Sequence, residues 1–377
     1  MAARSSSITL HTFRDNSQEI PTQKESIEKP NPQLQNDFPE GGKHAWLTVA
    51  GASACLFVSF GWVNCVGIFQ EYYRTHQLKE YTASEIAWIP SSQVFFMIFS
   101  GLFVSTWFLA KRGAAMGLVV SGSSLGGVIF PIMLIHLIPE VGFAWAMRIC
   151  AFLILALLAF ANATMRSRVP PTKRPFEVMA LLRPFKEPTF VSLTAAVFFF
   201  YWGMFIPITF IVEHALSHGM SLHLANYLVP ILNGASIFGR TIPNALADKV
   251  GHFNVMIVMS GFTAILILAF WLPATGNAAI IVFAALFGIG SGAGVGLTPA
   301  LCAKISPLPE IGTRTGAAFS ISAFAALTGS PIGGKLVADE HGSFKYAIVF
   351  GGVSCAIGCM LFIATRASLV GMKMAKV

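Results

Sequence analysis

The sequence predicts an all-α integral membrane protein of about ten transmembrane helices, arranged as a bundle of four followed by a bundle of six. The 377 residues are 55% hydrophobic and only 11% charged, and their mean hydropathy is +0.68. A soluble domain of this length carries far more charge. In addition, ten apolar windows are long enough to cross a hydrocarbon core of roughly 30 Å.

The first half of the chain holds a polar tail and four of these windows. Residues 1–43 are rich in Ser, Pro, Gln and Asn and lack the apolar core of a signal peptide, so they predict a disordered cytosolic tail. Residues 44–165 then form the predicted N-terminal bundle. Its spans are Trp46–Phe69, Ile86–Ala110, Gly113–Leu137 and Val141–Met165.

The second half begins with a basic, proline-containing stretch, residues 166–188, which is predicted to be a cytosolic linker. Residues 189–368 form the predicted C-terminal bundle, and residues 369–377 a short cytosolic tail. The six spans of this bundle are Phe190–Val212, Leu224–Leu246, Val255–Pro273, Ala278–Ala303, Gly316–Gly334 and Tyr346–Ala364.

The basic residues are distributed unevenly between the two sides of the predicted membrane. With both termini in the cytosol, Arg74, Lys79, Lys335 and Lys345 fall outside and two arginines lie within spans, which leaves 19 of the 25 Lys and Arg on the cytosolic side. This distribution satisfies the positive-inside rule. The net charge of +8 therefore reflects topology rather than a nucleic-acid surface, and we expect a multi-pass protein of the plasma membrane surrounded by lipid.

Neither catalysis nor metal binding is indicated by the sequence. All six cysteines lie within apolar windows, without a His or an acid at ligand spacing, so buried thiols are expected. Paired carboxylates and nucleophiles with an adjacent base are likewise missing from the spans and their surroundings. We therefore expect no enzymatic activity, no metal and no cofactor, with proton coupling left open.

Glycines at a spacing of four predict close contacts between helices. Gly288, Gly292 and Gly296 share one helical face, as do Gly122 and Gly126. Such faces carry no side-chain bulk, and a neighbouring membrane helix can therefore approach closely.

Three motifs resemble a known family. Two runs, Glu40-Gly-Gly-Lys-His-Ala-Trp46 and Trp107-Phe-Leu-Ala-Lys-Arg-Gly-Ala-Ala-Met-Gly117 followed by Ser121–Pro131, are similar to segments of the monocarboxylate porter branch of the major facilitator superfamily, in its fungal form. The third run, Gly239-Arg-Thr-Ile-Pro-Asn-Ala-Leu-Ala-Asp-Lys-Val-Gly251, resembles the loop motif of the whole superfamily. The likeness covers about residues 38–368. It implies a two-bundle secondary transporter that moves a small organic anion or related metabolite, either a monocarboxylate or an exported secondary metabolite, by alternating access.

One departure from the family pattern shapes the prediction. After Leu102-Phe103 the family continues into a first-half copy of the turn motif and two further helices, whereas this chain passes directly to Trp107-Phe108. Counterparts of helices three and four are thus predicted to be absent, which removes roughly 60 residues. Two alternatives stay open: a carrier-derived membrane sensor or binding protein that does not transport, and an incomplete sequence of a twelve-helix transporter.

Arg240 is the chief candidate for substrate binding. A charged side chain within a span costs about 2.5 to 3.5 kcal/mol unless it faces protein or water, and the resemblance aligns Arg240 with an arginine of the family's eighth helix. Snorkelling toward the membrane surface is the alternative role.

The resemblance also places neutral polar side chains along the same cavity, namely Asn64, Gln93, Tyr201 and Asn233. Hydrogen bonding between helices is their alternative role. The family's helix-one lysine and helix-eight aspartate correspond here to Asn64 and Ser236, which disfavours a lactate-type, proton-coupled mechanism.

Residues at predicted cytosolic helix ends are the candidates for gating. Asp248, Lys249 and Arg314 are placed where an acid can interact with a helix N-terminus and a base with a C-terminus, at about 0.3 to 1 kcal/mol each. Gly239 and Gly251 bracket the turn motif and complete the predicted gating set.

Overall fold

The computed structural model describes residues 42–65, 68–69, 72–73, 80, 88, 112–165, 181–307 and 310–371. Every regular element within these residues is a helix, and seven of the helices are long and apolar enough to cross a membrane by length and composition. The predicted all-α class is therefore confirmed. The second predicted span, Ile86–Ala110, lies outside the described residues except for Trp88.

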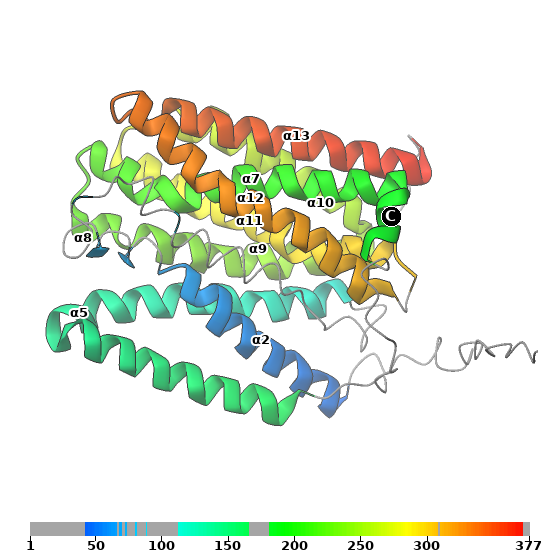
Figure 1. The fold of residues 1–377 in the computed structure, drawn as a ribbon, viewed down its shortest axis with the longest axis horizontal. Coiled ribbons are helices and arrows are strands. Elements are labelled where there is room, and N and C mark those ends of the chain that lie inside the picture. Colours follow the sequence, from blue (N-terminus) through cyan, green and yellow to red (C-terminus); the bar gives the residue numbers. More distant parts are fainter. Residues whose placement is uncertain are drawn as a thin grey trace, which may run out of the picture. The chain divides into compact units, whose positions relative to one another are not determined.

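Two long helices build the described part of the first half (Figure 1). Helix α2 covers Lys43–Val63, and α5 covers Arg112–Thr164. The backbone of α5 leaves helical geometry at Gly142, where φ is 78° and ψ is 161°. Glycine adopts a positive φ without a Cβ clash, so the chain reverses there. The two limbs of α5 correspond to the predicted spans Gly113–Leu137 and Val141–Met165.

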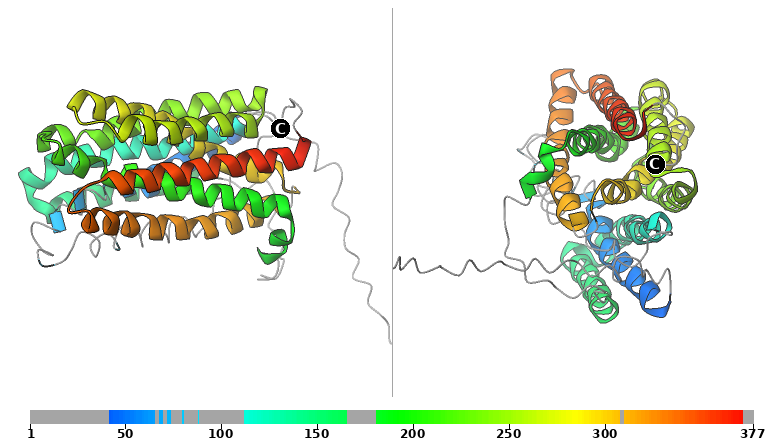
Figure 2. Two further views of the ribbon diagram at one scale, coloured as in Figure 1. Left: turned by 90° about the horizontal axis from the view of Figure 1, so that it is seen from above. Right: turned by 90° about the vertical axis from the view of Figure 1, so that its right-hand side faces the viewer.

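The second half contains a helix for each of its six predicted spans. The third of them, α10, continues into a short π-helical turn, η3. In chain order the elements are η2 (Arg183–Lys186), α7 (Pro188–Ser217), α8 (Leu222–Ala225), α9 (Leu228–Val250), α10 (His252–Ile265), η3 (Leu266–Trp271), α11 (Asn277–Lys304), α12 (Ile311–Asp339) and α13 (Lys345–Val370). Seen end-on, α2 and both limbs of α5 form a group beside these helices (Figure 2).

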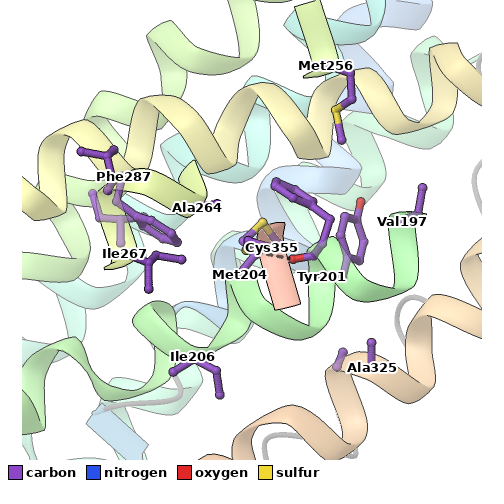
Figure 3. Close-up of a cluster of buried hydrophobic side chains, with 14 of the residues drawn as sticks. Val197, Tyr201, Met204, Ile206, Met256, Ala264, Ile267, Phe287, Ala325 and Cys355 are labelled. Atoms are coloured by element: carbon purple, nitrogen blue, oxygen red, sulfur yellow. Dashed lines mark hydrogen bonds between the residues drawn. The ribbon is translucent and has the colours of Figure 1, made fainter. Parts of the chain in front are cut away.

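The largest hydrophobic core of the described residues lies within the second half. Tyr201 and Met204 of α7 project into it, Met256 comes from α10 and Cys355 from α13 (Figure 3). The Cys355 thiol donates to the carbonyl oxygen of Phe200 at 3.6 Å. Four of the six cysteines are buried, the other two are half-buried, and none forms a disulfide, as expected for thiols within apolar helices.

The glycine faces pack as predicted. On α11, a Cβ at Gly288 would lie 2.1 Å from the Leu232 carbonyl oxygen, and one at Gly292 would lie 2.6 Å from the Ser236 hydroxyl, both on α9. On α5, a Cβ at Gly126 would lie 2.2 Å from the Phe57 carbonyl oxygen of α2. A side chain at any of these glycines would overlap the neighbouring helix. Glycine therefore allows the two helix backbones to lie closer together than another residue type would. Helix α9 is fixed against α11, and the first limb of α5 is fixed against α2.

The second limb of α5 is much more exposed than the first. Phe152 and Leu155 are each about two-thirds exposed, and the guanidinium of Arg148 lies 4.9 Å from the centre of the exposed Trp145 ring. Apolar side chains in such positions are suited to lipid contact, and an exposed arginine can reach the membrane surface along its aliphatic stem. Arg148 is therefore separate from the buried polar groups described next.

Candidate functional site

A continuous polar face runs along α9 and meets the first half of the chain. It consists of Asn233, Ser236, Arg240, Asn244 and Asp248, spaced by three or four residues, so that all five lie on one side of the helix. We call the contact of this face with α2 and α5 the polar seam. Its hydrogen bonds join residues more than a hundred positions apart.

Two side-chain pairs close one end of the polar seam. The Asn233 amide nitrogen donates to the Asn64 amide oxygen at 2.9 Å, and the Asn64 nitrogen donates to the Phe60 carbonyl oxygen. The Ser124 hydroxyl of α5 donates to the Ser236 hydroxyl at 3.2 Å. Two of the predicted binding residues, Asn64 and Asn233, are therefore in direct contact across the two halves.

Arg240 occupies the middle of the polar seam and is 9% exposed. Its Nη1 donates to the Val120 carbonyl oxygen of α5 at 2.9 Å and to the Ser123 hydroxyl. Its Nε is buried without a partner, and no described residue supplies a carboxylate within ion-pair distance of the guanidinium. Arg240 is thus a buried cation that receives only neutral acceptors from the described chain.

Tyr201 approaches this arginine from α7. It is 3% exposed, its hydroxyl lies near Thr298 of α11, and it is close enough to Arg240 for an electrostatic interaction. Its ring centre lies 6.3 Å from that of Phe319 on α12. The structure therefore gathers four of the five predicted binding residues around the polar seam. The fifth, Gln93, lies outside the described residues.

Asp248 holds the other end of the polar seam. One of its carboxylate oxygens accepts the Ala114 backbone N–H at 3.0 Å, in the first turn of α5, and the other lies 3.3 Å from His252 Nε2. The first N–H groups of a helix have no intrahelical acceptor and carry a partial positive charge. The predicted contact between an acid and a neighbouring helix N-terminus is present here, and it joins the two halves. We call this the Asp248 end.

Within the described residues, the other predicted gating residues make no bond between the two halves. Gly239 packs against the Ile289 carbonyl oxygen of α11, and Gly251, at φ 111°, ends α9. Lys249 is exposed at the end of α9. Among the described residues, these three make no hydrogen bond to the first half.

Arg314, at the start of α12, binds within the second half instead. Its two terminal nitrogens donate to the two carboxylate oxygens of Glu187 at 2.7 and 2.5 Å, and its Nε donates to Glu310 at 3.0 Å. The hydrogen bond from Arg314 lowers the pKa of the Glu187 carboxyl below its usual value of 4.5. This arginine therefore ties α12 to the residue that precedes α7.

Replacing Glu187 with Gln should lower the thermal midpoint of the protein modestly and only above acidic pH. Glu187 is half-exposed, so the pair contributes about 0.2 to 1 kcal/mol, or a few degrees at most. Because the folded-state pKa is lowered, this stabilisation is complete above pH 4.5 and is lost as pH falls through the lowered value. The thermal midpoints of the wild type and of Glu187→Gln should therefore converge as pH is lowered. A difference between the two midpoints that grew on acidification would contradict the stabilising role of the pair between Glu187 and Arg314.

Sequence reasoning missed Ser123, Ser124 and Asn244. Asn244 is fully buried, its amide nitrogen donates to the Arg240 carbonyl oxygen at 2.7 Å, and its amide oxygen has no partner. The spacing of the polar residues of α9 at three and four positions was a usable signal for Asn244. For the serines no such signal exists, because glycine-rich packing explains their segment equally well.

The Major Facilitator Superfamily model matches residues 92–313 and 193–371. An MFS-type transporter of Penicillium oxalicum is 48% identical over 392 aligned positions, which cover 88% of this chain and 92% of the relative. The fujikurins efflux protein of Gibberella fujikuroi is 38% identical over 388 positions, covering 87% of this chain and 83% of the relative.

Among solved structures, the fucose:proton symporter of E. coli aligns with 89% of this chain and 92% of its own, with a TM-score of 0.54. The sequences are 13% identical, so this likeness concerns the fold alone.

Proposed function

The chain belongs to the Major Facilitator Superfamily, and from that premise we propose that it exports a small acidic metabolite across the plasma membrane by alternating access. The superfamily comprises multi-pass membrane transporters, so the expectation of a protein without enzymatic chemistry agrees with the family. The substrate class, the direction and the alternating mechanism are the proposal. Its fungal relative in Gibberella fujikuroi, named as an efflux protein, favours export.

The observation that carries the substrate class is the environment of Arg240. A cation buried within a membrane bundle normally pairs with an acid or a backbone carbonyl. Here Val120 and Ser123 supply neutral acceptors to one nitrogen, while Nε is unpaired. A substrate carboxylate would provide the missing negative charge and fill the unpaired donor. Arg240 is therefore the proposed anion receptor, with Asn64, Asn233 and Tyr201 as neutral hydrogen-bonding groups beside it.

A carrier of the fungal branch that moves a larger organic acid fits these residues better than a carrier of lactate. The polar side chains near Arg240 in the described residues include serines, asparagines and Tyr201, which do not exchange protons near neutral pH. We therefore propose an organic acid larger than lactate, recognised by hydrogen bonds as well as charge. Substrate movement would not depend on a protonated carboxyl group in this region.

Gating is proposed to occur at the Asp248 end, with that end facing the cytosol. The contact of Asp248 with the first turn of α5 crosses between the two halves. Opening of the carrier toward the cytosol must break it. Both chain termini lie on the cytosolic side in this proposal, as the distribution of basic residues favours.

We also propose that counterparts of helices three and four are absent. The Penicillium oxalicum alignment extends over 392 positions, yet 88% of this 377-residue chain amounts to about 330 residues, and the 388-position alignment gives the same result. About 60 positions of each relative thus face a gap, the length of two spans with their loops. Sequencing transcripts across the codons for Leu102–Trp107 tests this, and an in-frame insert of that length would overturn it.

The transport proposal is tested in energised, inside-out membrane vesicles that carry the protein, with vesicles that lack it as the control. Because export from the cell corresponds to uptake by an inside-out vesicle, the vesicles with the protein should accumulate an acidic metabolite from a cell extract, measured by mass spectrometry. Vesicles with Arg240→Ala should not accumulate it. Accumulation of neutral compounds alone would contradict the anion receptor, and saturable binding without accumulation would favour a sensor.

A further inference from the structure

We infer that Ser123, together with the Val120 carbonyl group, is a positioning residue that turns one edge of Arg240 toward a planar carboxylate. This inference rests on the proposed role of Arg240 as the anion receptor and assigns the orientation of its guanidinium to α5. It adds a residue on the opposite half of the protein to the determinants of substrate specificity.

The contacts on Nη1 fix the guanidinium on one side. Nη1 donates to both the Val120 carbonyl oxygen and the Ser123 hydroxyl, and the Ser123 hydroxyl itself donates to the Val120 carbonyl oxygen at 2.7 Å. The single proton of Ser123 is thereby used, and its lone pairs are left to accept from the arginine. Two groups in mutual contact, the Val120 carbonyl and the Ser123 hydroxyl, hold one nitrogen of the planar, rigid guanidinium.

The opposite edge of the guanidinium makes no hydrogen bond with the described residues. The hydrogen bonds of Arg240 within the described residues all start from Nη1, and the buried Nε has no partner. Nε and Nη2 present two parallel N–H groups, a geometry that matches the two oxygens of a carboxylate. An amide of the same shape offers only one acceptor oxygen, so the edge discriminates by charge and by geometry.

Neighbouring serines on α5 do not share this arrangement. The Ser121 hydroxyl donates to the Leu118 carbonyl oxygen of its own helix at 2.7 Å, and Ser124 is bonded to Ser236. Ser121 therefore provides a matched control, with the same residue type on the same helix and no contact with the arginine.

The positioning contact depends on the two halves being together. Ser123 belongs to α5 and Arg240 to α9, so separation of these helices removes both acceptors from Nη1. The guanidinium then loses its fixed orientation, and with it the bidentate geometry offered to the anion. Carboxylate affinity is in this way linked to the contact between α5 and α9 at Ser123.

The test uses the purified full chain in lipid nanodiscs, with benzoate as the anionic probe and benzamide as its neutral isostere. Ser123→Ala should weaken benzoate binding by about tenfold, the scale of a lost hydrogen bond to a charged group, and leave benzamide binding unchanged. Ser123→Thr retains the hydroxyl and should restore benzoate affinity to within about twofold, while Ser121→Ala should match the wild type.

A double-mutant cycle separates positioning from a general packing effect. If Ser123 acts through the guanidinium fork, Ser123→Ala should have no further effect on benzoate binding in an Arg240→Lys background. Equal losses in both backgrounds, equal losses for benzoate and benzamide, or a Ser123→Ala protein that matches Ser121→Ala would each overturn the positioning role.

The same measurements distinguish this inference from the proposed function beneath it. Strong dependence of benzoate binding on Arg240 without dependence on Ser123 would leave the anion receptor standing and remove only the positioning role. Wild-type protein that does not bind millimolar benzoate, or does not prefer it over benzamide, would remove both.

Discussion

Arg240→Ala should reduce transport of the acidic substrate by at least about a hundredfold, the scale expected when one partner of a buried, hydrogen-bonded charge pair is truncated. Arg240 is a buried cation in the middle of the polar seam. Its removal would leave the substrate carboxylate without a counter-charge when the carboxylate loses its water. Initial rates in vesicles, normalised to the amount of inserted protein, measure the effect.

Arg240→Lys refines this result. Lysine keeps the positive charge but lacks the planar fork, so it cannot hold Val120 with one nitrogen while presenting two parallel donors to a carboxylate. We expect transport to fall by about tenfold or more, between the wild type and the alanine variant.

Arg148→Ala is the matched control, because Arg148 is an exposed arginine of another predicted span, stacked on Trp145. Its transport rate should stay within about twofold of the wild type, as for a surface substitution. Near-normal transport by Arg240→Ala, with insertion intact, would show that the carrier binds its substrate elsewhere.

Gly126→Leu should destabilise the first half strongly. A Cβ at this position would lie 2.2 Å from the Phe57 carbonyl oxygen and 2.8 Å from the Gly61 Cα, and both are backbone atoms of α2 that cannot rotate away. Separation of α2 from α5 is the only relief, at a cost of about 3 kcal/mol or more. The thermal midpoint should fall by about 10 °C, or the protein should aggregate on extraction.

Gly316→Leu serves as the control for this substitution. Gly316 also lies within a helix, α12, but nothing lies within 4 Å of a Cβ built there. Leucine has a higher helix propensity than glycine, so the midpoint should be unchanged or slightly higher. A similar loss of stability in both variants would indicate a general effect of added bulk rather than a specific helix contact.

The helices were predictable from the sequence because a span must be long and apolar, and both properties are local. Their ends were less predictable where tertiary contacts extend a helix. The predicted span in α7 stops at Val212, yet the helix continues to Ser217, and the polar His214 in the added turn is buried, with its Nδ1 accepting from the Trp271 indole at 3.3 Å. Such a partner lies too far along the chain for a window of hydropathy to include.

The candidate site was predictable by residue type but not by partner. An arginine within a span and an aspartate at a helix end are conspicuous in sequence, and the structure places both in the polar seam. The partner of Arg314, the carboxylate of Glu187 at the end of the linker, was not named from the sequence, because it lies more than a hundred residues away along the chain. Ser123 was missed because its importance depends on the register between α5 and α9, which a single sequence does not contain.

The composition of α9 has a consequence for how the protein enters the membrane. Helix α9 is not among the seven helices that are apolar enough to span by composition, and its 23 residues include Arg240, Asp248 and Lys249 as well as two asparagines. The partners of its polar face, such as Ser124 and the Val120 carbonyl oxygen, lie more than a hundred positions earlier in the chain, in the first limb of α5. During biosynthesis the first limb of α5 would therefore already be in the bilayer when α9 leaves the ribosome. Its polar groups can then bind the polar face of α9 and so stabilise the insertion of this less hydrophobic helix.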